Sequence, residues 1–418
     1  MKVLINRVYN TYNIGSAMMA INLIYYMYNN EKEIEFYTDI DDEDNLRRLR
    51  LSCCTDKIYM NNIKLSSKTI AEKVIDKLMN ITIRKFDEGK INFLYSRRLK
   101  KYAKAIEEQY TKVIILGGDD LSSEYPLRGI MHQIKMIDSL SDNIKVILFG
   151  HTLGPFEGKK AAYIHKVLEK CMICPRDIVT YDYLKERLRK GNIELTADLA
   201  FLDLPNPGEK YRNNKFIKGD CDYITLIPSG LYKYYTNDRN RYLEVWSNIV
   251  KSILNNKELR KYKIIFMSHV TKPDSVSDIL IIDDLIEKLN SQLSEELKKR
   301  IVRICYSEML PYEARDILGG GYFTLTGRMH GAVSTFQMGK PAISIAYSNK
   351  YKGVIGGLGF NDLIIDGKGE KLWRGNEIVD EVDKIIEKII LNYDIYLENI
   401  NISVEKCKKR ILYCIKKI

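Results

Sequence analysis

Short apolar runs alternate with amphipathic, helix-like stretches along almost the entire chain. Lys2–Asn6 fits a strand, and apolar side chains spaced at the helical period within Ser16–Tyr28 predict the helix that follows it. Val113–Leu116 and Lys145–Phe149 are continuous apolar runs, typical of parallel strands covered on both faces. Similar runs recur in the second half, at Tyr223–Ile227, Lys263–Met267, Val302–Cys305, Tyr322–Leu325 and Ala342–Ala346. The pattern predicts an α/β fold with parallel sheets.

The chain is long enough for two domains, because 418 residues exceed the usual size of a single core. Leu202–Gly208 has two prolines and a glycine and is the best linker. We therefore expect two Rossmann-like domains facing a cleft, at 1–208 and 209–385. A basic helical tail, 386–418, is expected to pack back on the first domain, with a membrane-surface helix as the alternative. No role is predicted for the basic region 45–110.

The formal net charge of +11 favours an anionic partner: nucleic acid, an anionic membrane surface or a phosphorylated substrate. No zinc-finger, RRM or KH signature accompanies the charge, so we do not expect nucleic-acid binding. No apolar run approaches the ~20 residues that cross a bilayer, and the N-terminus does not resemble a signal peptide. We expect a cytoplasmic protein; the basic tail would tolerate the anionic inner face of the cell membrane, and peripheral contact there is the alternative to a tail that only packs on the first domain. A lone CxxC at 171–174 gives no reason to expect a metal.

Polar and glycine residues follow the predicted strands, where open α/β sheets bind their ligands. Asn13 and Gly15 come after the first strand, either as a ligand-binding loop or as a plain capped turn. Gly117 and Gly118 follow Val113–Leu116 and allow close approach of a ligand to the backbone. Asp119 comes next. Three roles stay open for it: binding sugar hydroxyls, acting as a base, or only capping the following turn.

Two more polar positions end strands of the first half. His151 follows Lys145–Phe149, and we expect it to face the cleft as a base, unless it only hydrogen-bonds a loop. Arg176 and Asp177 form a polar island, to be read either as ligand-binding or as a buried structural pair.

The segment around Gly327 carries the most chemistry. Arg328 and His330 lie two residues apart after a strand and before a small-residue helix start. A helix N-terminus offers free N–H groups and a favourable dipole, and a permanent cation beside a group that titrates near neutrality suits an anionic substrate undergoing proton transfer. The alternative is a surface ion pair and a core histidine. Other strands of this half end in further polar residues: His269, Tyr347 and Lys350.

In this order, the motifs resemble the polysaccharide pyruvyltransferase family. The matching segments are Asn13–Gly15, Leu116–Gly118, Gly150–Pro155, Arg176–Asp177, Ala197–Phe201, His269 with Asp278, Arg328–His330 and Pro341–Lys350. The closing stretch, from Gly327 to Lys350, is the most specific. The family often has glutamine in place of His151 and glycine in place of Asp119, which puts the identity of the acceptor in doubt more than the reaction.

The resemblance implies a GT-B-like architecture with no metal or cofactor. It implies transfer of the pyruvyl group of phosphoenolpyruvate, held by the second domain, onto two hydroxyls of a sugar or lipid-linked oligosaccharide on the first, giving a cyclic ketal and phosphate. The expected catalytic residues are His330, Arg328 and His151. The expected substrate-binding residues are Arg176, Asn13, Gly15, Gly117, Gly118, Asp119, His269, Met329, Tyr347 and Lys350.

Two other classes of protein stay open. One is a GT-B glycosyltransferase that uses a nucleotide sugar, with Tyr306–Glu308 placed where a ribose-binding carboxylate would lie. The other is a non-catalytic protein that binds polyanions or membranes through its basic charge. The acceptor sugar, the ketal stereochemistry and the oligomeric state are not predicted.

Overall fold

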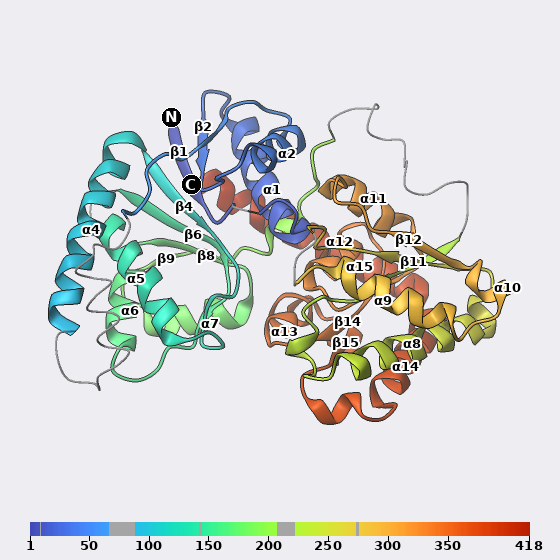
Figure 1. The fold of residues 1–418 in the computed structure, drawn as a ribbon. Helices are drawn as coiled ribbons and strands as arrows, with labels where there is room; N and C mark the ends of the chain where they lie inside the picture. Colours follow the sequence, from blue (N-terminus) through green and yellow to red (C-terminus); the bar gives the residue numbers. More distant parts are fainter. Residues whose placement is uncertain (9, 67–87, 142–143, 207–221, 273–275) are drawn as a thin grey trace.

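The structure is a computed structural model that describes residues 1–8, 10–66, 88–141, 144–206, 222–272 and 276–418. It has two lobes, each built on a parallel sheet with helices on both faces (Figure 1). The predicted α/β fold with two Rossmann-like units is therefore confirmed. The boundary predicted between 208 and 209 lies outside the described residues.

The first lobe contains a seven-stranded sheet with the order β3-β2-β1-β4-β6-β8-β9. Its strands are β1 (Lys2–Asn6), β2 (Glu35–Thr38), β3 (Ile58–Met60), β4 (Lys112–Leu116), β6 (Lys145–His151), β8 (Met172–Pro175) and β9 (Asn192–Ile193). Two further strands, β5 (Leu121–Ser122) and β7 (Leu153–Gly154), follow β4 and β6 in the chain and form a separate two-stranded sheet. The helices of the lobe are α1 (Ile14–Asn30), α2 (Glu43–Cys53), α4 (Glu88–Gln109), α5 (Leu127–Ser141), α6 (Ala161–Leu168) and α7 (Ile178–Arg187).

Successive side chains of each central strand enter different cores, because they point to opposite faces of the sheet. In β1, Val3 and Ile5 pack with the apolar side chains of α1, whereas Leu4 packs with those of α4, α5 and α6. Both faces are thus covered, which explains why these strands are continuous apolar runs rather than alternating ones.

The second lobe contains a six-stranded sheet with the order β12-β11-β10-β13-β14-β15. Its strands are β10 (Tyr223–Ile227), β11 (Lys263–Met267), β12 (Ile301–Ile304), β13 (Thr324–Thr326), β14 (Ala342–Ala346) and β15 (Ile364–Asp366). Its helices are α8 (Arg239–Asn255), α9 (Asp278–Asn290), α10 (Glu295–Lys298), α11 (Pro311–Gly320), α12 (Met329–Gln337), α13 (Lys350–Val354) and α14 (Glu377–Leu391).

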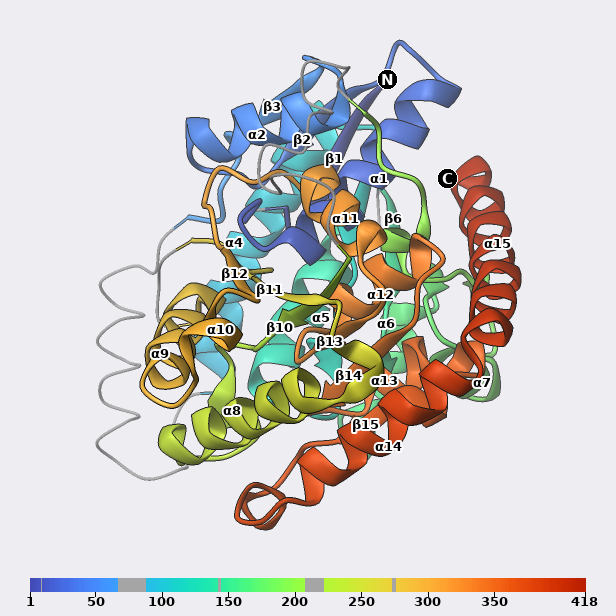
Figure 2. The ribbon, with the colours of Figure 1, turned by 90° about the vertical axis from the view of Figure 1, so that its right-hand side faces the viewer.

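The last helix, α15 (Tyr393–Lys417), returns from the second lobe to the first (Figure 2). It packs against α1 and α12, and the Lys112 ammonium donates a hydrogen bond to the carbonyl of Ile418. The prediction that the tail packs back on the first domain is confirmed. Of the helices in the described ranges, none is both long enough and apolar enough to cross a membrane.

Several elements differ from the prediction in detail. The first helix begins at Ile14 instead of Ser16, because Asn13 is its N-cap and accepts a hydrogen bond from the Ser16 N–H at 3.4 Å. Strand β8 was missed, since a four-residue apolar run has no periodicity to distinguish it. Within the basic region 45–110, Glu88–Gln109 form the helix α4, and 67–87 lie outside the described residues.

Candidate active site

The carboxyl ends of strands from both lobes surround one cavity of about 580 Å³. The first lobe contributes the loops after β1, β4 and β8, and the second contributes those after β10, β11, β13 and β14. Eleven of the predicted site residues line it: Asn13, Gly117, Gly118, Asp119, Arg176, His269, Arg328, Met329, His330, Tyr347 and Lys350. Residues separated by more than 300 positions in the sequence are therefore brought into one site.

Two predicted residues lie behind the wall of the cavity. Gly15 faces His330, and a Cβ atom at Gly15 would stand 2.4 Å from the imidazole Nδ1. Glycine at this position therefore makes room for the His330 ring.

His151 is fully buried, and its Nε2 lies 3.1 Å from the carbonyl of Ile115. Burial, followed by the positive charge of Arg7, lowers the pKa of His151 to about 3. The prediction that His151 faces the cleft is wrong. The pairing between β6 and β8 shifts by a residue between Phe149 and His151, which turns the side chain inward.

The turn from β13 to α12 places the Arg328 and His330 side chains. The Thr326 hydroxyl accepts a hydrogen bond from the Arg328 N–H at 2.8 Å. The Gly327 carbonyl accepts from the Tyr235 hydroxyl at 2.6 Å and the Tyr351 hydroxyl at 2.7 Å. A side chain at Gly327 would stand 2.9 Å from the Tyr235 hydroxyl, so glycine lets the tyrosines hold the turn. The site is therefore fixed by a buried aromatic cluster beneath it.

Arg328 is held by Asp278, the first residue of α9. The Arg328 Nη2 and Nε donate to one Asp278 oxygen at 2.7 and 2.9 Å. Asp278 also accepts from the backbone N–H groups of Gly230, His269 and Val270. One fully buried carboxylate thus ties the loops after β10 and β11 to the arginine. Arg328 Nη1 makes no hydrogen bond to any described residue, which leaves a donor for a ligand.

A second buried carboxylate, Asp198, joins the two lobes. It accepts from Arg176 Nη1 at 2.8 Å, and the His330 Nε2 lies 3.3 Å from the same oxygen. Burial by itself would raise the pKa of Asp198, but His330 and Arg176 hold that pKa below its usual value. The carboxylate therefore holds the imidazole in a defined orientation.

The alternative interpretation of Arg176 and Asp177, a buried pair with each other, is wrong. Arg176 pairs with Asp198, and Asp177 instead caps α7, accepting from the Thr180 N–H at 2.8 Å. The island is split because Arg176 ends β8 and faces the cavity, while Asp177 begins the next helix.

Lys350 connects the lobes on another wall of the cavity. Its Nζ lies 3.2 Å from an Asp119 oxygen and donates to the Tyr347 hydroxyl at 2.7 Å. Burial would lower the pKa of Lys350, but Tyr347 and Asp119 raise it above its usual value. Lys350 is therefore a cation at neutral pH.

His269 presents a neutral imidazole to the cavity. Its side chain is 1% exposed, and among the described residues its Nε2 has no hydrogen-bond partner. Burial, followed by the charges of His330 and Arg328, lowers the pKa of His269 well below its usual value. A buried polar atom without a partner is costly, so this nitrogen is suited to contact a ligand.

Sequence reasoning missed a polar wall in the first lobe. Arg7 pairs with Asp120, and Gln133 Nε2 donates to Asp120 at 3.0 Å, all three at the cavity. Arg7 also has a positive φ of 75°, which is rare outside glycine and was not visible in the sequence. The Asp120 carboxylate was visible only as the second of two aspartates after Gly118.

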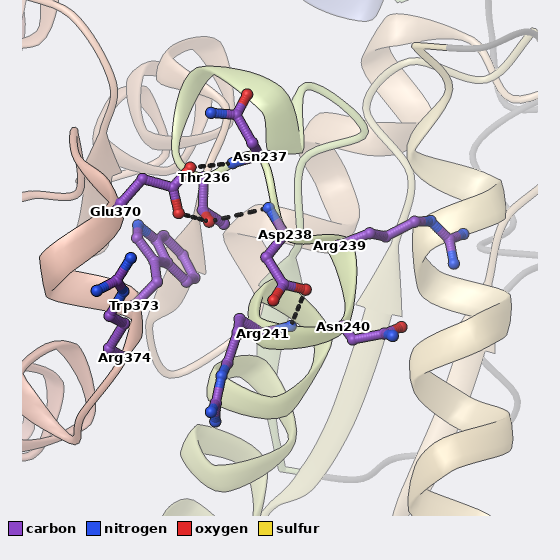
Figure 3. A pocket seen from close by; sticks show the side chains of 9 residues that line it. All are labelled: Thr236, Asn237, Asp238, Arg239, Asn240, Arg241, Glu370, Trp373 and Arg374. Atoms are coloured by element: carbon purple, nitrogen blue, oxygen red, sulfur yellow. Dashed lines mark hydrogen bonds between the residues drawn. The ribbon is translucent and has the colours of Figure 1, made fainter.

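A second large cavity, of about 680 Å³, lies on the second lobe around Trp373 (Figure 3). The acidic side chains that line this cavity, Glu370 and Asp238, accept hydrogen bonds from the protein. Glu370 accepts from the Thr236 hydroxyl at 2.8 Å and the Asn237 N–H at 2.6 Å, and Asp238 caps α8. The cavity between the lobes is therefore the stronger candidate for the active site. No cluster of three metal-ligating side chains occurs among the described residues.

Two lobes built on parallel sheets, with a common cavity at the carboxyl ends of their strands, define a GT-B-like protein. Solved structures support this fold. The UDP-GlcNAc 2-epimerase of Neisseria meningitidis, bound to UDP-GlcNAc, matches with a TM-score of 0.56 at 10% identity, covering 99% of this chain and 100% of the other. The S. aureus MnaA-UDP co-structure matches with a TM-score of 0.52 at 11% identity, covering 100% and 97%. Identities this low show the fold alone.

The family model of polysaccharide pyruvyl transferase matches residues 13–349. The chain belongs to this family. It is also 21% identical over 361 residues to the amylovoran biosynthesis protein AmsJ of Erwinia amylovora, covering 82% of this chain and 83% of that protein. The matched residues include nearly the whole cavity wall, from Asn13 to the edge of α13.

Proposed function

We propose that this protein transfers the pyruvyl group of phosphoenolpyruvate onto two hydroxyls of a sugar, forming a cyclic ketal and releasing phosphate. The observation that carries the proposal is the buried Asp198 carboxylate, which joins Arg176 of the first lobe to His330 of the second at one cavity. A donor with a carboxylate and a phosphate needs several cations and N–H groups around it. Arg176, Arg328 and Lys350 supply the cations, and the start of α12 supplies N–H groups.

Each cation already has a carboxylate partner, so the donor does not enter a strongly positive cavity. It would instead be bound by the donors that remain, because Arg176 Nη2 and Arg328 Nη1 make no hydrogen bond to a described residue. Such pre-positioned arginines bind an oxyanion without first rearranging, which favours charge stabilisation in the transition state.

The reaction requires a proton at the methylene carbon of the donor and the addition of one sugar hydroxyl to C2. The second hydroxyl then displaces phosphate. One hydroxyl proton ends on the new methyl group and the other on phosphate, so no external acid is consumed. We assign the proton relay to His330, oriented by Asp198, because it is the partly exposed imidazole of the cavity. The neutral His269 would donate a hydrogen bond to the donor or the sugar.

The test is the release of inorganic phosphate from phosphoenolpyruvate across a panel of acceptor sugars, with mass spectrometry of the product. His330→Ala should lower turnover by about 10²–10⁴-fold, the usual contribution of general acid–base catalysis. His132→Ala, which removes an exposed histidine on α5, is the matched control and should have no effect. Near-normal turnover by His330→Ala would remove it from the mechanism. The absence of phosphate release with every acceptor would reject the proposal.

A further inference from the structure

Arg315, on α11 of the second lobe, is a buried cation that does not line the active-site cavity. It is 3% exposed, and each hydrogen bond that its guanidinium makes to a described residue goes to an uncharged atom. Burial lowers the pKa of Arg315 to about 10, so the side chain is still charged at neutral pH. A buried charge without a hydrogen-bonded counter-ion is costly, and a neutral side chain would serve packing alone at lower cost.

The Arg315 guanidinium reaches the first lobe and holds the end of the short 3₁₀ helix η1 (Leu199–Phe201). Its Nη1 donates to the Leu202 carbonyl at 2.7 Å, and its Nη2 donates to the Ala200 carbonyl at 2.5 Å. Nη2 also lies 3.2 Å from the sulfur of Met18, on α1. Two separate carbonyls suit the planar fork of arginine, which presents several N–H groups in a fixed geometry.

The segment that Arg315 holds is the one that carries Asp198. Asp198 is the N-cap of η1, and its Oδ1 accepts from the Ala200 N–H at 3.0 Å. Its Oδ2 is the oxygen that contacts Arg176 and His330. Ala200 is therefore bonded to Asp198 through its N–H and to Arg315 through its carbonyl. A movement of η1 would carry the Asp198 carboxylate with it.

Arg315 and His330 belong to neighbouring helices of the second lobe. His330 is the second residue of α12, and α11 packs beside α12 (Figure 2). Both side chains contact one segment of the first lobe, so Arg315 ties Asp198 to the helix pair that carries the imidazole. The charge of Arg315 is also favourable near the Asp198 carboxylate, which a neutral donor would not provide.

We propose that Arg315 is a positioning residue of the active site, which holds η1 so that Asp198 stays in contact with the His330 imidazole. The inference rests on the proposed function, in which His330 relays the proton. It adds that a residue behind the cavity wall, on the lobe that carries His330, controls the rate of the chemical step.

The test compares Arg315→Lys with Arg300→Lys in the phosphate-release assay. Arg300 is the matched control, because its guanidinium also donates to backbone carbonyls, but these lie within the second lobe and do not line the cavity: Leu254, Leu259 and Tyr262. Arg315→Lys keeps the charge, but a single nitrogen cannot take the places of Nη1 and Nη2 together. A displacement near 1 Å costs on the order of 10²-fold in rate, so we expect a partial shift of η1 to lower kcat by about tenfold. The KM for phosphoenolpyruvate should change less, and Arg300→Lys should keep the wild-type kcat.

Two further variants separate positioning from general stability. Arg315→Met removes the charge and both hydrogen bonds, and should lower kcat by about 10²-fold, so that lysine restores part of the loss. In the His330→Ala background, Arg315→Lys should cause little further loss, because the imidazole that Asp198 orients is absent.

A wild-type kcat in Arg315→Lys, an equal loss in Arg300→Lys, or an undiminished loss in the His330→Ala background would overturn the inference while leaving the proposed function in place. If no acceptor releases phosphate, the proposed function fails, and NMR of isotope-labelled histidine imidazoles still decides on Arg315. The chain has five histidines, and His330→Ala identifies the His330 signals. Arg315→Lys should shift these signals and Arg300→Lys should not. Unchanged His330 signals in Arg315→Lys would overturn the inference.

Discussion

A single methyl group added behind His330 tests how closely the reaction depends on the position of the imidazole. In Gly15→Ala the new Cβ would stand 2.4 Å from Nδ1, 2.5 Å from Cγ and 2.6 Å from Cβ of His330. Ordinary contacts begin near 3.5 Å, so the ring must move by about 1 Å. A displacement of this size costs on the order of 10²-fold in rate when the moved group reacts directly with substrate.

The fold should tolerate the change. Gly15 lies in the first turn of α1 and does not have a positive φ, and alanine favours a helix over glycine by about 0.5–1 kcal/mol. This gain offsets part of the cost of moving His330, about 1–3 kcal/mol for an overpacked site. We therefore expect Gly15→Ala to remain folded, to unfold at a somewhat lower urea concentration than the wild type, and to release phosphate about 10²-fold more slowly. The loss should appear in kcat rather than in KM for phosphoenolpyruvate.

The matched control is Gly129→Ala, the same change in an early turn of α5, where an added Cβ meets nothing within 4 Å. It should leave turnover unchanged. In the His330→Ala background, Gly15→Ala should cause little further loss of turnover, because the imidazole is absent and only the contact with the Cβ of residue 330 remains. Wild-type turnover by Gly15→Ala, or an equal further loss without the imidazole, would refute the assignment of the proton relay to His330.

Three other predictions concern stability. Asp198→Asn leaves Arg176 buried without a counter-charge and should lower the free energy of unfolding in urea by about 3–5 kcal/mol, whereas the exposed Asp182→Asn should change it little. Burial raises the pKa of Asp198, but His330 and Arg176 lower it more, so the folded-state pKa is below the unfolded-state value of about 3.9. The ionised Asp198 therefore stabilises the fold fully above a pH of about 3.9, and this stabilisation is lost as the pH falls below that value. Asp198→Asn should accordingly make the free energy of unfolding in urea depend less on pH in the acid range. Arg48→Ala removes hydrogen bonds across the lobes to the carbonyls of residues 307–309, together with stacking on Tyr12 of its own lobe. It should speed amide hydrogen exchange at residues 307–309, and unchanged exchange there would contradict the importance of this contact.

The sequence predicted the main strands well, and it also predicted the residues whose position depends only on their neighbours in the chain. The strands Lys2–Asn6, Tyr223–Ile227, Lys263–Met267 and Ala342–Ala346 have the predicted bounds, because strands buried on both faces are continuous apolar runs. Arg328 and His330 were found because a strand end, a glycine and a helix start are adjacent in the chain. Their placement at the carboxyl end of a sheet follows from parallel topology alone.

The partners of those residues were decided by the tertiary structure. Asp198 lies 132 positions from His330, and Asp278 lies 50 positions from Arg328, so no local pattern could pair either with its partner. Asp198 had appeared only within a matching segment, with no role assigned.

For His151, the tertiary structure removed a predicted site residue instead of adding a partner. The sequence places it at the end of a strand, but a shift in strand pairing turns it into the core. The chain by itself determined which residues stand at the strand ends. Which way each side chain points, and which charge it meets, was decided only by packing, because a one-residue change of register reverses the face that a side chain occupies.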